Sequence, residues 1–311
     1  CAHALRVVFP YLIFNVPEKQ ESGNEKLSSF ILSGMIALGF SKARDVVSFG
    51  KMSFFVLKSR FEVMLAGLGQ ISMLARDAVT SLLTWKITWR DFLYQLYFIG
   101  VKSQAVVLIT GAFTGMVLGA QTYFQFHKVK MDTATLAVVA VSMCSELGPV
   151  LTGLMVAGRV GAAMAAEIGT MRVTEQIDAL RTLATHPVDY LVVPRLAASM
   201  AALPLLMVEA IILGIGASYV VGIYVLQIDP VYSWYNMLHF THEIDLVEGL
   251  VKAFIYGGII ALIGCYKGLT CGLGAEGVGK ATTEAVVYSS ITILIVNFFL
   301  TLTLGKILGL M

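Results

Sequence analysis

Five apolar stretches, each about as long as a membrane is thick, constrain what this 311-residue chain can fold into. They span residues 101–126, 133–158, 196–226, 246–264 and 285–304. A helix needs about 20 mainly apolar residues to cross the hydrocarbon of a bilayer. The composition agrees, because 57% of the residues are hydrophobic and only 14% are charged. We therefore expect an all-α integral membrane protein with five transmembrane helices.

The third stretch, 196–226, is too long for one helix perpendicular to the membrane and too short for two. Pro204 lies within it. Proline removes a backbone hydrogen bond and bends a helix. We expect either a kink at Pro204 or a first part of the stretch that lies at the membrane surface.

Basic residues between the apolar stretches indicate how the chain crosses the membrane, because lysine and arginine stay preferentially on the cytoplasmic side. On one side lie Arg159, Arg172, Arg181 and Arg195, between the second and third stretches, and Lys267 and Lys280, between the last two. On the other side, residues 227–245 contain no lysine or arginine but include the interfacial aromatics Tyr232, Trp234 and Tyr235. We predict a cytoplasmic amino terminus and an external carboxyl terminus, with Lys128 and Lys130 as exceptions on the outer side.

The first 98 residues differ from the rest, and we divide the chain into region 1–98 and a membrane domain, 99–311. Residues 17–26 read PEKQESGNEK, a polar linker. Beyond it, Arg44, Ser48, Lys51, Lys58 and Glu62 share one helical stripe. This pattern favours amphipathic helices in the headgroup plane, and a packed soluble helix is the alternative. Trp85 and Trp89 are typical of an anchor before the first span.

The stretch GAEGVGKATTEA at 274–285 is close to the phosphate-binding pattern G-x-x-x-x-G-K-[ST]. The last position is Ala281, which has no hydroxyl to hold Mg²⁺. The pattern also needs a preceding strand, whereas here it lies between two apolar stretches. We interpret it as a turn and helix start in which Thr282 or Thr283 acts as a cap.

Two carboxylates lie inside apolar stretches, where an ionised group is costly unless it is paired or faces water. Glu146 lies in the second stretch and is followed by Gly148 and Pro149, which loosen the helix. Glu146 is therefore a functional candidate. Glu209, in the third stretch, is equally consistent with a structural partner for another polar group.

Other patterns in the sequence are less specific. Gly111, Gly115 and Gly119 form overlapping G-x-x-x-G steps, which favour close helix packing either within the chain or across a dimer. The four cysteines have neither redox nor zinc spacing, and we expect buried or reduced thiols. His239 and His242, near Glu243 and Asp245, are better explained as solvated loop residues than as metal ligands. A net charge of +2 does not favour nucleic-acid binding.

A charged segment follows the second stretch. Its charged residues include Glu167, Arg172, Glu175, Asp178 and Arg181. No Ser/His/Asp or Cys/His set accompanies them, so the sequence predicts no catalytic residues and no metal site. We interpret the segment as a docking surface for a soluble partner on the cytoplasmic side.

The same segment carries a family resemblance. The sequence ELGPVLTGLMVAGRVGAAMAAEIGTMRVTEQIDAL, which begins at Glu146, resembles the MlaE/YrbE family of ABC-transporter permeases, which move lipids for systems built around MCE-domain proteins. GMVLGAQ at 115–121, HPVDYLVVPRL at 186–196 and GVGKATTEAVV at 277–287 extend the resemblance over about 91–311.

The resemblance implies a homodimeric, five-span permease of the bacterial inner membrane, with its carboxyl terminus in the periplasm. It implies a cytoplasmic coupling helix between spans two and three that binds a separate ABC ATPase through Glu167, Arg172, Glu175, Gln176 and Asp178. The chain itself would need no cofactor, because ATP and Mg²⁺ belong to the ATPase. An MCE-domain protein on the outer side and a small STAS-type cytoplasmic protein are the other expected partners.

The resemblance also implies a path for phospholipid near the dimer axis. The residues expected along it are Leu118, Gln121, Gln125, Phe126 and Glu146. Ser145 stands where some relatives have a basic residue before the ELGP glutamate. The alternative function is a structural anchor that links an ATPase to an MCE complex without forming the path. A lipid-modifying enzyme would need a nucleophile or metal constellation, and the sequence offers none.

Overall fold

The structure, a computed structural model, describes residues 67, 69–82, 89–184 and 186–307. These residues belong to one compact unit, Gly67–Met311. The polar linker at 17–26, the charged stripe from Arg44 to Glu62 and Trp85 lie outside the described residues. The proposed boundary between residues 98 and 99 stays a prediction.

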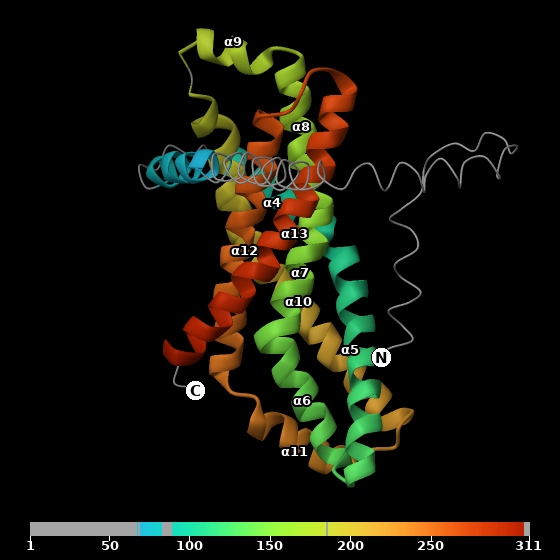
Figure 1. Cartoon of the computed structure of the whole chain (residues 1–311). Helices are drawn as coiled ribbons and strands as arrows, with labels where there is room; N and C mark the ends of the chain where they lie inside the picture. Colours follow the sequence, from blue (N-terminus) through green and yellow to red (C-terminus); the bar gives the residue numbers. More distant parts are fainter. Residues whose placement is uncertain (1–66, 68, 83–88, 185, 308–311) are drawn as a thin grey trace, which may run out of the picture. The chain divides into compact units, whose positions relative to one another are not determined.

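Helices make up all the regular structure of the described residues, which contain no strand (Figure 1). The first labelled elements are α4 (Trp89–Ile99), the 3-10 turn η2 (Val101–Ser103) and α5 (Gln104–Phe126). They are followed by α6 (Thr135–Ser142), α7 (Gly148–Val156), α8 (Ala162–Val173) and α9 (Gln176–Thr182). The last are α10 (Val193–Tyr224), α11 (Pro230–Phe240), α12 (Glu243–Leu269) and α13 (Gly274–Ile307).

Five helical segments are long and apolar enough to cross a membrane. They are Trp89–Val129, Asp132–Val173, Val188–Tyr224, Glu243–Leu269 and Gly274–Ile307. The predicted all-α class and the five spans are therefore confirmed. In the third span, α10 continues through Pro204 as one helix.

Three π-helical turns interrupt the long helices, and each holds one charged residue. The turns are η5 (Met143–Leu147), η6 (Ala157–Gly161) and η7 (Val188–Val192). The charged residues are Glu146, Arg159 and Asp189. A π turn inserts one extra residue into a helix and so changes where the next side chains point, which is why such turns are frequent at functional sites.

The three glycines of α5 form a close seam with α10, which decides between the two readings of the G-x-x-x-G steps. Gly111, Gly115 and Gly119 of α5 lie against Ala210, Gly214 and Ser218 of α10. A Cβ atom at Gly115 would overlap the backbone of Gly214. The two helices pack along one another (Figure 1). These glycines therefore serve packing within the chain, and we call this contact the glycine seam.

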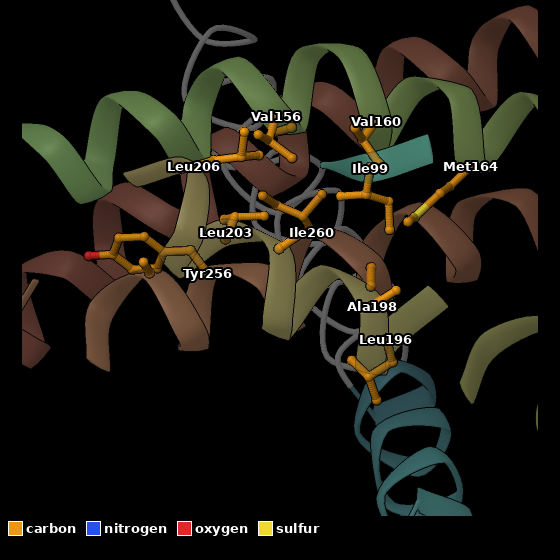
Figure 2. Close-up of a cluster of buried hydrophobic side chains, with 14 of the residues drawn as sticks. Ile99, Val156, Val160, Met164, Leu196, Ala198, Leu203, Leu206, Tyr256 and Ile260 are labelled. Atoms are coloured by element: carbon orange, nitrogen blue, oxygen red, sulfur yellow. The ribbon is translucent and has the colours of Figure 1, made fainter. Parts of the chain in front are cut away.

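The apolar core lies where α4, α7, α8, α10 and α12 meet (Figure 2). Its fully buried side chains include Ile99, Val160, Leu203, Tyr256 and Ile260. Three of the cysteines, Cys144, Cys265 and Cys271, are buried and free, as the sequence predicts.

The loop between the third and fourth spans contains a helix, α11, which lies at the opposite end of the bundle from α9 (Figure 1). Asp229 caps α11 by accepting two backbone N–H donors. At the start of α12, Asp245 accepts the backbone N–H of His242 at 2.9 Å as part of a capping box. His239 stacks on Tyr235. Asp229 thus caps the start of α11, and His242 and Asp245 cap the start of α12.

The phosphate-like stretch is helical from its first residue, because α13 begins at Gly274. The predicted cap is wrong. The hydroxyls of Thr282 and Thr283 donate to the carbonyl oxygen of Gly279 at 2.6 and 2.7 Å, whereas a cap would accept a backbone N–H. Helix α12 and a short turn precede the stretch, so the strand that a phosphate-binding loop requires is not there.

Candidate functional site

Glu146 lies in the π turn η5 of the second span, near the middle of the apolar stretch 133–158. Its side chain is 34% exposed, so its carboxylate is neither sealed in the core nor freely solvated. A charge at this depth is costly unless other groups stabilise it. Side chains of α12 and α13 surround the carboxylate and provide that stabilisation.

Lys252 of α12 is the principal partner of Glu146. Its side chain is fully buried, and its Nζ atom lies 2.6 Å from Glu146 Oε1 and 2.6 Å from Glu248 Oε1. The same ammonium donates to the carbonyl oxygen of Ser145 at 3.0 Å. We call Glu146, Glu248 and Lys252 the charged centre. It carries two carboxylates and one ammonium, and so has one negative charge in excess when all three groups are ionised.

Helix α13 completes the surroundings of Glu146 through two neutral side chains. Asn297 Nδ2 donates to Glu146 Oε2 at 3.0 Å, and Thr301 Oγ1 donates to Glu146 Oε1 at 2.7 Å. The hydroxyl of Tyr256 donates to Asn297 Oδ1 at 2.6 Å and fixes that amide. Because Asn297 and Thr301 of α13 both donate to Glu146, separation of α13 from the second span would break these two hydrogen bonds.

The lipid-path residues predicted on α5 lie apart from this network. Gln121 and Gln125 are exposed, and Leu118 and Phe126 are half-buried. Among the described residues, no hydrogen bond or ion pair joins them to Glu146. Within one chain, the structure therefore does not bring the α5 residues and Glu146 together. Their common role in a path stays a prediction.

Glu209, the other carboxylate in a span, accepts a hydrogen bond from Gln104 Nε2 at 2.9 Å. Its second oxygen is buried and has no partner among the described residues. This contact joins α10 to the start of α5 and gives Glu209 the structural role that the sequence left open.

The predicted coupling residues divide into two groups. Glu167 forms an ion pair with the buried Arg195 at 3.0 Å, and Arg172 donates to the carbonyl oxygen of Leu269. These two residues hold α8 against the other helices. By contrast, the exposed side chains of Glu175, Gln176 and Asp178 at α9 form no ion pair or hydrogen bond with another of the described helices, and we call them the α9 surface. Buried Ile177 anchors this helix, so its polar side chains project from a fixed position.

Comparisons with known proteins give the chain a family. A family model described as Permease MlaE matches residues 92–303, which is more than half of the chain. The chain belongs to the MlaE permease family. It is therefore a transporter permease subunit, and the resemblance seen in the sequence is confirmed.

Relatives of this MlaE-family permease come from several organisms. A probable ABC transporter permease protein of Rickettsia felis is 46% identical over 233 residues, which is 75% of this chain and 90% of the relative. The intermembrane phospholipid transport system permease protein MlaE of Haemophilus influenzae is 35% identical over 208 residues, 67% of this chain and 80% of the relative. The chloroplastic protein TRIGALACTOSYLDIACYLGLYCEROL 1 of Arabidopsis thaliana is 39% identical over 236 residues, 74% of this chain and 66% of the relative.

Sequence reasoning missed the other two members of the charged centre of this permease. Glu248 and Lys252 lie within the apolar stretch 246–264, one helical turn apart. Two opposite charges at this spacing inside a span indicate an ion pair. This signal could have predicted the pair from the sequence. The contact with Glu146, 106 residues away in the chain, leaves no local signal.

Proposed function

We propose that this permease moves phospholipid between a bacterial inner membrane and an MCE-domain lipid carrier, with ATP hydrolysed by a separate ABC ATPase subunit. The printed names of relatives support the class of transporter and its cargo. The observation that carries the proposal is the position of Glu146, a partly exposed carboxylate within a membrane span that side chains of α12 and α13 hold in place.

A path for an amphiphile needs apolar walls for the acyl chains and a few polar groups for the headgroup. Glu146 supplies such a group in the second span. Leu118, Gln121, Gln125 and Phe126 of α5 supply a mixed apolar and polar surface, much of it exposed in the single chain. A homodimer would allow the α5 surface of one copy to approach Glu146 of the other, so that the path forms near the dimer axis.

The ATPase is assigned to the α9 surface. Glu175, Gln176 and Asp178 are exposed, and the ion pair of Asp178 with Arg181 at 3.0 Å is itself exposed, so it leaves both side chains accessible. A carboxylate that becomes buried against a complementary charge on a partner contributes strongly to binding, since truncating one member of such a pair costs about 2–5 kcal/mol of binding free energy. Residues Glu167 and Arg172 position this surface. A small STAS-type protein would bind at the same end.

The excess of arginine and lysine at the α8–α9 end supports the orientation. We propose that α9 and the amino terminus lie in the cytoplasm, and that α11 and the carboxyl terminus lie in the periplasm, where the MCE protein would bind. Tyr232 and Trp234 of α11 are exposed, as interfacial aromatics are.

Reconstitution of the complete transporter tests this function. Vesicles that hold the permease, the ATPase and the MCE protein should transfer labelled phospholipid to acceptor vesicles only when ATP is supplied. The permease alone should hydrolyse no ATP, because Ala281 offers no ligand to Mg²⁺. ATP hydrolysis by the complete complex without any phospholipid transfer would contradict the proposal and favour the structural-anchor alternative.

The α9 assignment has its own test. Reversing Glu175 and Asp178 to lysine together should release the ATPase in a pull-down from detergent, while the permease stays folded. The matched control reverses Glu276, an exposed carboxylate in the first turn of α13 and outside the α9 surface, and should retain the ATPase. If the double variant keeps normal ATPase binding and transfer, α9 is an ordinary solvated helix.

A further inference from the structure

A cavity of about 460 Å³ lies between α4 and α8, away from the charged centre. Its lining residues are Tyr94, Gln95 and Phe98 of α4, and Ala163, Ala166, Glu167 and Thr170 of α8. The alanines leave room for a ligand, while the aromatic rings and the amide and hydroxyl groups give both apolar and polar contacts. Glu167 is neutralised by Arg195, so its carboxylate does not make the cavity anionic.

Two cations flank the Phe98 ring that lines this cavity. Lys102 Nζ lies 5.0 Å from the ring centroid, and Arg159 Cζ lies 5.9 Å from it. Arg159 also donates to the buried hydroxyl oxygen of Ser103 at 2.5 Å. Among the described residues, no carboxylate forms an ion pair with either cation. Arg195 and Lys252, by contrast, each form an ion pair with a carboxylate.

The position of the two cations in their spans places them at a membrane boundary. Lys102 lies in η2, directly before α5, whose 23 residues are enough to cross the hydrocarbon. Arg159 lies in η6, at the end of the apolar stretch 133–158. Both cations are therefore at headgroup depth, on the side of the membrane where α8 continues towards α9.

We propose that Lys102 and Arg159 bind the phosphate of an anionic phospholipid in the leaflet on the α8 side, with part of the lipid in the adjacent cavity. Basic pockets between helices at the edge of a membrane are suited to anionic headgroups. A guanidinium can donate two parallel hydrogen bonds to a phosphate, and the lysine adds a flexible point charge. The lipid supplies the anion that the described residues do not provide.

This site does not depend on the proposed transport function, because it can be measured on the purified permease without its partners. The full chain in a mild detergent is titrated with phosphatidylglycerol and, separately, with phosphatidylcholine of the same acyl chains. Native mass spectrometry counts the lipids retained. We expect preferential retention of phosphatidylglycerol by the unmodified chain.

The decisive variant is Lys102→Gln, because the Lys102 side chain is exposed and forms no hydrogen bond with any side chain or backbone group among the described residues. Each basic residue near the membrane surface raises the affinity for an anionic lipid about fivefold, so in this variant the preference for phosphatidylglycerol over phosphatidylcholine should fall about fivefold. Lys306→Gln is the matched control, since Lys306 is also exposed but lies in the last turn of α13. It should keep the full preference.

Two further experiments serve as controls. The first distinguishes loss of the Arg159 charge from damage to the fold, and the second distinguishes binding of a lipid from binding of a free anion. Arg159→Lys keeps the charge and should retain more phosphatidylglycerol than Arg159→Gln, which also tests the guanidinium. Inorganic phosphate at millimolar concentration should not displace the lipid, because it has no acyl chains for the cavity. An unchanged lipid preference in Lys102→Gln and Arg159→Gln, or displacement by inorganic phosphate alone, would overturn the proposal.

Discussion

The glycine seam and the charged centre join membrane helices in opposite ways. At the glycine seam, α5 and α10 approach until the backbone of Gly115 meets that of Gly214, with no room for a side chain. At the charged centre, Lys252 is buried between Glu146 and Glu248, and α13 adds neutral hydrogen-bond donors. Apolar burial does little to hold either contact, because lipid tails are as apolar as leucine.

The difference indicates where the permease can respond to a ligand. The glycine seam is close packing between backbones, which a lipid headgroup cannot alter without separating the helices. The charged centre has a partly exposed member, Glu146, whose hydrogen bonds reach two other helices. A group that approaches Glu146 competes with those bonds, and so couples occupancy of the site to the positions of α12 and α13.

Loss of the lysine should have the largest effect on stability. Lys252→Met leaves Glu146 and Glu248 without their shared cation, and removing one partner of a buried ion pair costs about 3–5 kcal/mol. We expect a large drop in folded protein and in the unfolding midpoint in detergent. The triple variant Lys252→Met, Glu146→Gln, Glu248→Gln removes all three charges and should recover most of the loss. A single variant as stable as the unmodified chain would show that Lys252 is not needed to neutralise the centre.

A methyl group in the glycine seam should have the next largest effect. Gly115→Ala forces α5 away from α10, and overpacking of this kind costs about 1–3 kcal/mol. Gly216→Ala on α10 is the matched control, because its Cβ atom would meet nothing within 4 Å. Thermal unfolding in detergent measures both. Equal stability of the two variants would contradict the account of the seam.

The hydrogen bond from α13 should have the smallest effect on stability. Thr301→Val removes the donor to Glu146 Oε1, and hydrogen bonds between membrane helices contribute about 0.6 kcal/mol on average. Thr303→Val is the control, since its hydroxyl donates only within α13, to Phe299. A loss of several kcal/mol in the Thr301 variant would mean that α13 is held mainly by Glu146.

The sequence predicts the five spans well, because the thickness of the hydrocarbon fixes their length. It does not predict where the helices begin and end, because helical turns that extend beyond the hydrocarbon can be polar and so give no hydropathy signal. The start of α13 at Gly274 is an example, because the apolar stretch of this span begins only at residue 285. The spacing of Gly111, Gly115 and Gly119 predicts a groove but contains no information about which helix fills it.

The candidate site was predictable only in part. Glu146 can be recognised as a candidate from the sequence, because an ionised carboxylate inside an apolar stretch has a high free-energy cost unless it has a function or a partner. Its stabilisation depends on Lys252, Asn297 and Thr301, which are distant in the chain, and only packing brings them to it. The exposure of the α9 surface follows from its charges, whereas the tie between Glu167 and Arg195 does not.

The central claim is that Glu146, the exposed member of the charged centre, acts on the lipid. The most direct test compares Glu146→Gln with Glu248→Gln in reconstituted phospholipid transfer, with ATPase retention measured in the same samples. Each variant removes one negative charge and leaves Lys252 with one carboxylate, but Glu248 is only 6% exposed and Glu146 is 34% exposed. We predict that both variants retain the ATPase and that only Glu146→Gln loses most of its lipid transfer. Equal transfer by the two variants would contradict the claim.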